Sequence, residues 1–247
     1  MRRLIPLALL WAWLPSPALA ACVRGNFAVA VDAGHTSQDP GSTSARGKPE
    51  FEFNQRLALE LVAALQLAGF DKAFLINPNG REVTLRERTR VAESKGGDIF
   101  LSLHHDSVQP HYLSSWTHGG ETKKYSDIFS GFSLFVSAGN VNAKTSRKAA
   151  QAIGRGLVRR GIRPTLHHAE PISGESRTLL EPALGIYRRD TLAVLRTSSV
   201  PAVLVEAGVI VHRAEEARLE QAGHRAKIIA ALREGVLAAC AATPAAQ

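Results

Sequence analysis

The chain lacks several features that would place it in a familiar class of protein. After its first twenty residues it has no apolar run long enough to span a bilayer. It contains no Gly-x-Ser-x-Gly sequence, and its two cysteines, Cys22 and Cys240, lie near its ends. A serine or cysteine nucleophile is therefore not expected. It also has no internal repeat, low-complexity block or linker. We therefore expect a single domain that spans residues 21–247, with a core at about 27–239.

Residues 1–20 have the three parts of a signal peptide in the usual order. Arg2 and Arg3 form a basic start, residues 4–14 are apolar, and Ala18-Leu19-Ala20 resembles a cleavage site. We therefore expect export to the periplasm or cell envelope. Loss of the two arginines lowers a formal charge of +8 to about +6. Outside the cytoplasm, this charge favours wall carboxylates or anionic membrane surfaces over nucleic acid as partners.

The two cysteines allow two interpretations. In an oxidising compartment, Cys22 and Cys240 are expected to form a disulfide that joins the two ends of the mature chain. In the chain-entropy model, closing so long a loop contributes roughly 4–5 kcal/mol. Residues 19–22, however, also resemble a lipobox, in which Cys22 becomes a lipidated first residue that anchors the protein to a membrane. The residues themselves leave both alternatives open.

Apolar strand patterns alternate with helical patterns along the whole chain. This alternation predicts an α/β domain, with a mostly parallel twisted sheet and helices on both faces. Two polar stretches, 108–130 and 171–182, are predicted to be surface loops. We expect strands at 27–32, 72–76, 98–104, 132–136 and 202–205, and helices at 50–67, 85–94, 146–160 and 222–239.

Three chemically capable side chains follow predicted strands, and a fourth begins a predicted helix. His35, His104 and Glu206 come at or just after the ends of three strands, and Glu50 starts the first long helix. In open α/β sheets, sites form outside the carboxyl ends of the strands. We therefore expect all four side chains to meet at one edge of the sheet.

This set of side chains suits metal-assisted hydrolysis. Two imidazoles and one carboxylate are a ligand set for catalytic zinc and leave a fourth position for water. A further carboxylate beside the metal serves as proton acceptor and donor. Glu206 closes an apolar run, where burying a carboxylate without a partner is costly, and this favours a functional role for it.

The motifs around these residues resemble the zinc-dependent N-acetylmuramoyl-L-alanine amidases, the family that includes the bacterial cell-division amidases. The resemblance covers about residues 27–239, and its motifs occur in the family's order. They are Asp32-Ala33-Gly34-His35, Asp39-Pro40-Gly41, Glu50 with Asn54, Ser102-Leu103-His104, Gly131 to Ser137, Val194-Leu195-Arg196, Pro201, Val203-Leu204-Val205-Glu206 and Ala214-Glu215-Glu216.

The resemblance implies a role for each residue of the site. His35, Glu50 and His104 would bind Zn²⁺, and Glu206 would be the catalytic base and acid. The substrate would be peptidoglycan, cut at the amide between N-acetylmuramoyl and L-alanine. Several residues are left open: Glu52 as a rival ligand, His105 as a substrate or supporting contact, and His212, which departs from the family pattern. Arg188, Arg189 and Arg196 are candidates to meet peptide carboxylates.

Two other functions are compatible with the same residues. One is a zinc peptidase that cuts the stem peptides of peptidoglycan with the same metal chemistry. The other is a non-catalytic wall-binding regulator of the same fold. An activator protein, if one exists, is not indicated by any motif.

Overall fold

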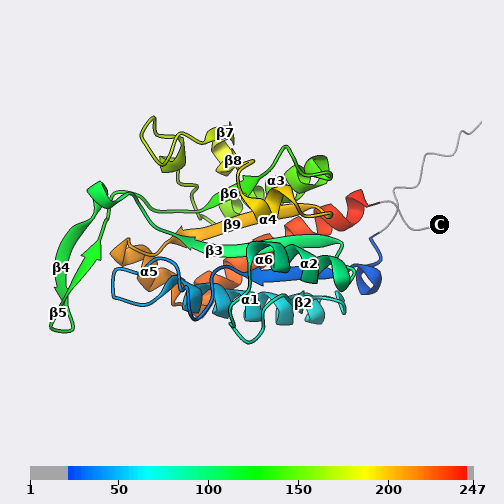
Figure 1. Ribbon diagram of the computed structural model, residues 1–247, viewed down its shortest axis with the longest axis horizontal. Helices are drawn as coiled ribbons and strands as arrows, with labels where there is room; N and C mark the ends of the chain where they lie inside the picture. Colours follow the sequence, from blue (N-terminus) through cyan, green and yellow to red (C-terminus); the bar gives the residue numbers. More distant parts are fainter. Residues whose placement is uncertain (1–21, 244–247) are drawn as a thin grey trace, which may run out of the picture.

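A seven-stranded sheet forms the centre of the protein, whose computed structural model describes residues 22–243 (Figure 1). The strand order is β2-β1-β3-β9-β6-β8-β7. The predicted signal peptide, residues 1–20, lies outside the described residues. The strands are β1 (Val29–Ala33), β2 (Phe74–Leu75), β3 (Ile99–Asp106), β6 (Ser133–Val136), β7 (Thr178–Glu181), β8 (Ile186–Arg188) and β9 (Ala202–Val209).

The sheet is mostly parallel, as the sequence predicts. Strands β1, β2, β3 and β9 run in one direction, and β6 and β8 are parallel to each other. The antiparallel pairs are β6 with β9 and β7 with β8. Because β1, β3 and β9 are adjacent and parallel, their carboxyl ends lie at one edge of the sheet, where functional residues are expected.

Helices cover both faces of the sheet, which confirms the predicted α/β class. On one face, α1, α3 and α6 pack against alternate strand residues such as Val31, Leu101 and Val203. On the other face, the shorter α2 and α4 cover Ala30, Phe100 and other apolar residues. The helices are α1 (Glu50–Leu67), α2 (Leu85–Ser94), α3 (Ala143–Arg159), α4 (Ala193–Arg196), α5 (Arg213–Leu219) and α6 (Ala222–Ala242).

The prediction that 108–130 is a surface loop is wrong. This stretch contains a hairpin of β4 (Ser114–His118) and β5 (Glu121–Tyr125), which extends beyond the edge of the sheet (Figure 1). Its two turn residues, Gly119 and Gly120, have φ of 61° and 82°. Such a two-glycine turn matches the twist of a hairpin and is a known hairpin signal. The predicted loop at 171–182 is likewise interrupted, because its end forms β7.

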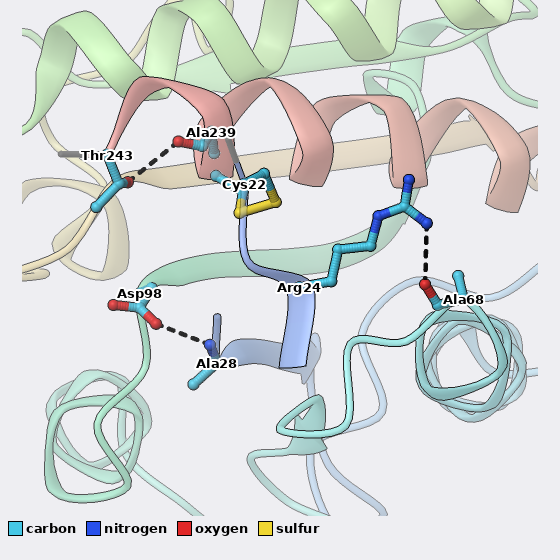
Figure 2. Close-up of a disulfide and its surroundings, with 8 residues drawn as sticks. Cys22, Arg24, Ala28, Ala68, Asp98, Ala239 and Thr243 are labelled. Carbon is cyan, nitrogen blue, oxygen red and sulfur yellow. Dashed lines mark hydrogen bonds between the residues drawn. A yellow bond between two sulfur atoms is a disulfide. The ribbon is translucent and has the colours of Figure 1, made fainter. Parts of the chain in front are cut away.

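The structure joins Cys22 to Cys240 in a disulfide, the first of the two alternatives (Figure 2). Their Cα atoms lie 5.2 Å apart although 218 residues separate them in sequence. The bond ties the segment before β1 to α6, and Ala28 N donates to Asp98 Oδ2 at 2.7 Å nearby. With this thiol paired, lipidation of Cys22 is not compatible with the structure. Within residues 22–243, no helix combines the length and apolarity needed to cross a membrane.

Reduction of this disulfide is expected to lower the free energy of unfolding by roughly 5 kcal/mol, because it releases a very long loop in the unfolded chain. Denaturant unfolding with and without reductant measures the effect. A Cys22→Ser/Cys240→Ser variant is the matched control, since its unfolding should not respond to reductant. Unfolding of the unaltered protein that is insensitive to reductant would contradict a stabilising role for the bond.

Candidate active site

Three of the residues predicted as metal ligands meet at the carboxyl edge of the sheet. His35 follows β1, His104 lies in β3, and Glu50 is the first residue of α1. The Glu50 carboxylate lies between the two rings, with Oε2 3.2 Å from His35 Nε2 and Oε1 3.0 Å from His104 Nδ1. One potential ligand atom from each of the three residues lies within 4.8 Å of the corresponding atoms of the other two. The geometry therefore brings together a donor set suited to one metal ion.

Two glycines allow this close approach. A Cβ at Gly34 would lie 2.2 Å from the His104 ring, and one at Gly41 would lie 2.6 Å from both Glu50 Oε2 and the His35 ring. Any larger side chain would displace these groups. His35 itself has φ of 67°, a left-handed conformation that is uncommon outside glycine and often marks functional sites. The glycines of the Asp-x-Gly-His and Asp-Pro-Gly motifs are thus required by packing around the site.

Glu50 is held in place by hydrogen bonds from both sides. Ser42 N donates to Oε2 at 3.1 Å, and Asn54 Nδ2 donates to Oε1 at 3.1 Å. Burial raises the pKa of Glu50, but its bonds to His104 and His35 outweigh burial and hold that pKa well below the usual value. A buried carboxylate kept ionised in this way suits cation binding.

His105 supports this arrangement from behind the carboxylate. Its Nδ1 lies 2.7 Å from Asn54 Oδ1, and its ring packs against Phe53. Burial lowers the pKa of His105 to about 3, so the ring is neutral near pH 7. Of the two roles left open by the sequence, these contacts favour a supporting one that orients Asn54 and, through it, Glu50.

Arg88 in α2 is a positioning residue that the sequence does not reveal. Its guanidinium donates to Asp32 Oδ1 at 2.6 Å, to the Ala33 carbonyl at 2.8 Å and to the His35 carbonyl at 2.7 Å. Ser102 Oγ completes the network by donating to Asp32 at 2.9 Å. Arg88 therefore fixes the end of β1 and the unusual backbone of His35. The partners are 56 residues apart in the chain, which no local pattern indicates.

Replacement of Arg88 by Met is expected to destabilise the protein by about 3–5 kcal/mol, because it leaves the buried Asp32 carboxylate without its cation. Thermal or denaturant unfolding measures the loss. Arg90→Met, an exposed position on the same helix, is the control and should change stability by less than about 0.5 kcal/mol. Equal effects of the two substitutions would show that the buried ion pair is unimportant.

Glu206 lies beside the donor group without belonging to it. It pairs with His104 in the register of β3 and β9, and its Oε2 is buried with no hydrogen-bond partner among the described residues. Burial, reinforced by the Asp106 and Glu50 carboxylates, raises the pKa of Glu206 well above the usual value. An unpartnered buried carboxylate is costly, so this oxygen is best explained by a bound cation, water or substrate.

An open pocket of about 300 Å³ connects these groups to solvent. His35, Glu50, His104 and Glu206 line this pocket, and Arg177 and Arg189 contribute positive charge to its lining. All four residues predicted to carry the chemistry therefore face one cavity. The donor set of His35, Glu50 and His104 fits a transition-metal ion such as Zn²⁺, and the Glu206 carboxylate lies beside it with one unpartnered oxygen.

Most of the other sequence candidates lie away from this pocket. Glu52 is exposed on α1. His212 caps the start of α5, where its side chain accepts a hydrogen bond from the Glu215 amide. Arg188 is exposed and pairs with Asp190, whereas its neighbour Arg189 lines the pocket. Only Arg189 among the three arginine candidates is part of the pocket wall.

The comparisons with known proteins agree with this architecture. The family model described as N-acetylmuramoyl-L-alanine amidase matches residues 29–238. The chain therefore belongs to the N-acetylmuramoyl-L-alanine amidase family, as the motifs indicate.

Two curated relatives carry the same description. N-acetylmuramoyl-L-alanine amidase AmiA of Escherichia coli is 25% identical, over 86% of this chain and 76% of its own length. Probable N-acetylmuramoyl-L-alanine amidase AmiB of Haemophilus influenzae is 24% identical, over 85% of this chain but only 51% of its own length. The chain thus spans about half of that second relative.

Solved structures share the fold. The amidase Ami1 of Mycobacterium smegmatis superposes with a TM-score of 0.67 and 21% identity, covering 88% of this chain and 98% of the other. The catalytic domain of the amidase CwlV of Paenibacillus polymyxa gives a TM-score of 0.63 and 21% identity, covering 85% and 96%. At these sequence identities, the structural similarity supports the conclusion that the protein has a single α/β fold.

Proposed function

We propose that this protein is an exported zinc-dependent enzyme that hydrolyses the amide between N-acetylmuramic acid and L-alanine in peptidoglycan. The observation that carries the proposal is the convergence of His35, Glu50 and His104 with the unpartnered Glu206 in one pocket. Family membership supports the substrate and the bond. The predicted signal peptide and the disulfide support export.

His35, Glu50 and His104 would hold the zinc ion. When bound, it would act as a Lewis acid toward the lactyl carbonyl and the attacking water. Asn54 and Ser42 hold the Glu50 carboxylate in its binding orientation. Arg88 holds the backbone that presents His35. These partners lie behind the ligands, a position from which they tune metal affinity.

Glu206 would move the proton. A carboxylate whose pKa is raised by burial accepts a proton more readily than one in water. We propose that Glu206 takes the proton released as water attacks the lactyl carbonyl. It then delivers this proton to the amine of L-alanine as the amide bond breaks. The bond changes balance: water adds across the amide, giving a lactyl carboxylate and a free amino terminus.

Digestion of purified peptidoglycan tests this function and separates the alternatives. Mass spectrometry of the products should show intact stem peptides with free L-alanine amino termini and glycan strands that carry lactyl carboxylates. Cuts between amino acids would instead identify a peptidase. The absence of any new product, with metal bound, would identify a non-catalytic protein.

Arg189 is expected to contribute to substrate binding, because its guanidinium lies in the pocket wall and its Nε is buried with no hydrogen-bond partner among the described residues. We expect Arg189→Ala to raise KM for muropeptides by about 10–100-fold, the usual range for a charged hydrogen bond, with a smaller change in kcat. Steady-state kinetics measure this. The exposed Arg188→Ala is the matched control, and equal KM values for the two variants would contradict the role.

A further inference from the structure

A second group of potential metal ligands lies beside the active site. Asp106 ends β3, and His167 and His168 belong to the short 3-10 helix η3 (His167–Ala169) between α3 and β7. One potential ligand atom from each of these three residues lies within 4.8 Å of the corresponding atoms of the other two. All three side chains are buried, with 8%, 2% and 7% of Asp106, His167 and His168 exposed. The group shares no residue with the first site.

Each histidine ring is oriented by a partner on its outer side. His167 Nδ1 lies 2.8 Å from Thr165 Oγ1, and His168 Nδ1 lies 2.8 Å from Glu175 Oε2. Consequently both rings turn Nε2 toward the same atom, Asp106 Oδ2, at 3.4 Å for His167 and 2.8 Å for His168. Histidines that bind metals typically have the second ring nitrogen bonded to a carboxylate, a backbone carbonyl or a water. Glu175 is such a partner, and the Thr165 hydroxyl takes the equivalent place beside His167.

One of these nitrogens has no hydrogen bond of its own. His167 Nε2 is buried and finds no hydrogen-bond partner within residues 22–243, although it points at a carboxylate oxygen. Buried polar atoms are nearly always paired, so an exception needs an explanation. A cation held between His167, His168 and Asp106 would satisfy this nitrogen and neutralise the carboxylate.

We propose that Asp106, His167 and His168 form a second divalent-metal site, distinct from the site of His35, Glu50 and His104. Two imidazoles and one carboxylate suit Zn²⁺ and its transition-metal neighbours better than Mg²⁺ or Ca²⁺, which take oxygen ligands. The site opens on the active-site pocket, because Asp106, His168 and Glu175 line that pocket's wall. An ion there fastens the connection between α3 and β7 to the end of β3.

The stoichiometry of metal binding tests this site without any assay of activity. Metal-free protein is dialysed to equilibrium against Zn²⁺, and bound metal is counted by mass spectrometry. We expect the unaltered protein to bind two ions per chain and His167→Gln to bind one. His104→Ala, which damages only the first site, is also expected to bind one. His118→Ala alters an exposed histidine on the β4–β5 hairpin and should leave two.

A second measurement does not depend on removing a ligand. Thr165→Val retains the shape of the side chain but removes the hydroxyl that orients His167. It is expected to weaken binding of the second ion by about 10–100-fold, as is usual for such outer partners, and to leave the first unchanged. Calorimetric titration with Zn²⁺ resolves the two.

Three results would overturn the proposal. They are saturation of the unaltered protein at one ion per chain, an unchanged count in folded His167→Gln, and no metal bound to folded His104→Ala. Any of them would mean that the Asp106, His167 and His168 group is a hydrogen-bonded cluster only. None of these results bears on amide hydrolysis at the first site, so the proposed function is judged separately.

Discussion

Glu206→Gln is expected to bind zinc at the first site as well as the unaltered protein does, and to hydrolyse peptidoglycan roughly 10²–10⁴ times more slowly. The size of the loss is the usual contribution of a general acid and base. Glutamine retains the shape of the side chain but neither accepts nor delivers the proton. Metal affinity is expected to survive because His35, Glu50 and His104 remain.

Product release from labelled peptidoglycan and metal counting on the same preparation measure both quantities. Glu52→Gln, an exposed carboxylate on α1, is the control and should have normal activity. Glu206→Gln is also expected to unfold at no lower temperature than the unaltered protein, because it replaces a carboxyl group that has one buried, unpartnered oxygen. Full activity of folded, metal-loaded Glu206→Gln would eliminate this residue as the proton carrier.

Loss of the first metal ion is expected to reduce activity by at least about 10³-fold, because a Lewis acid supplies several kcal/mol of transition-state stabilisation. Chelation followed by dialysis should abolish hydrolysis, and added Zn²⁺ should restore it. His104→Ala should show the same loss without recovery. Hydrolysis that persists after verified removal of metal would contradict the proposed mechanism.

Two controls accompany this test, one for the fold and one for the substitution of a histidine. Circular dichroism of the chelated protein is expected to retain its helical signal, because the apolar core and the disulfide do not depend on the metal. His111→Ala changes an exposed histidine outside both metal groups. Its activity should respond to chelation and to added Zn²⁺ as the unaltered protein does.

The sequence predicts the long elements better than the short ones. The helices expected at 50–67 and 85–94 have those bounds in the structure, because each shows a clear helical pattern and begins or ends at a recognisable signal. Strands β7 and β8 and helix α4 contain only three or four residues each. Such short segments are too short to show a recognisable periodicity of apolar residues. The polar pattern of residues 108–130 does not predict the hairpin of β4 and β5, although its Gly119-Gly120 turn is a hairpin signal.

In the candidate site too, the sequence predicts some features and not others. The four predicted residues lie together because each is placed by a long element: two strands, the end of a third, and the start of α1. Of the residues that hold them in place, Asn54 and His105 stand out in the sequence, whereas Arg88 does not. Arg88 reaches Asp32 and the His35 carbonyl from a different helix, and its place in the chain resembles that of any other helical arginine.

By itself, the sequence determined the class of fold, the family to which the chain belongs and the four side chains that line one pocket. These properties depend on local patterns, which are readable residue by residue. Only the tertiary structure decided that Cys22 pairs with Cys240, that Arg88 supports His35, and that His168 meets Asp106 across 62 residues. Such contacts arise when separate elements pack together, and packing depends on the whole core at once.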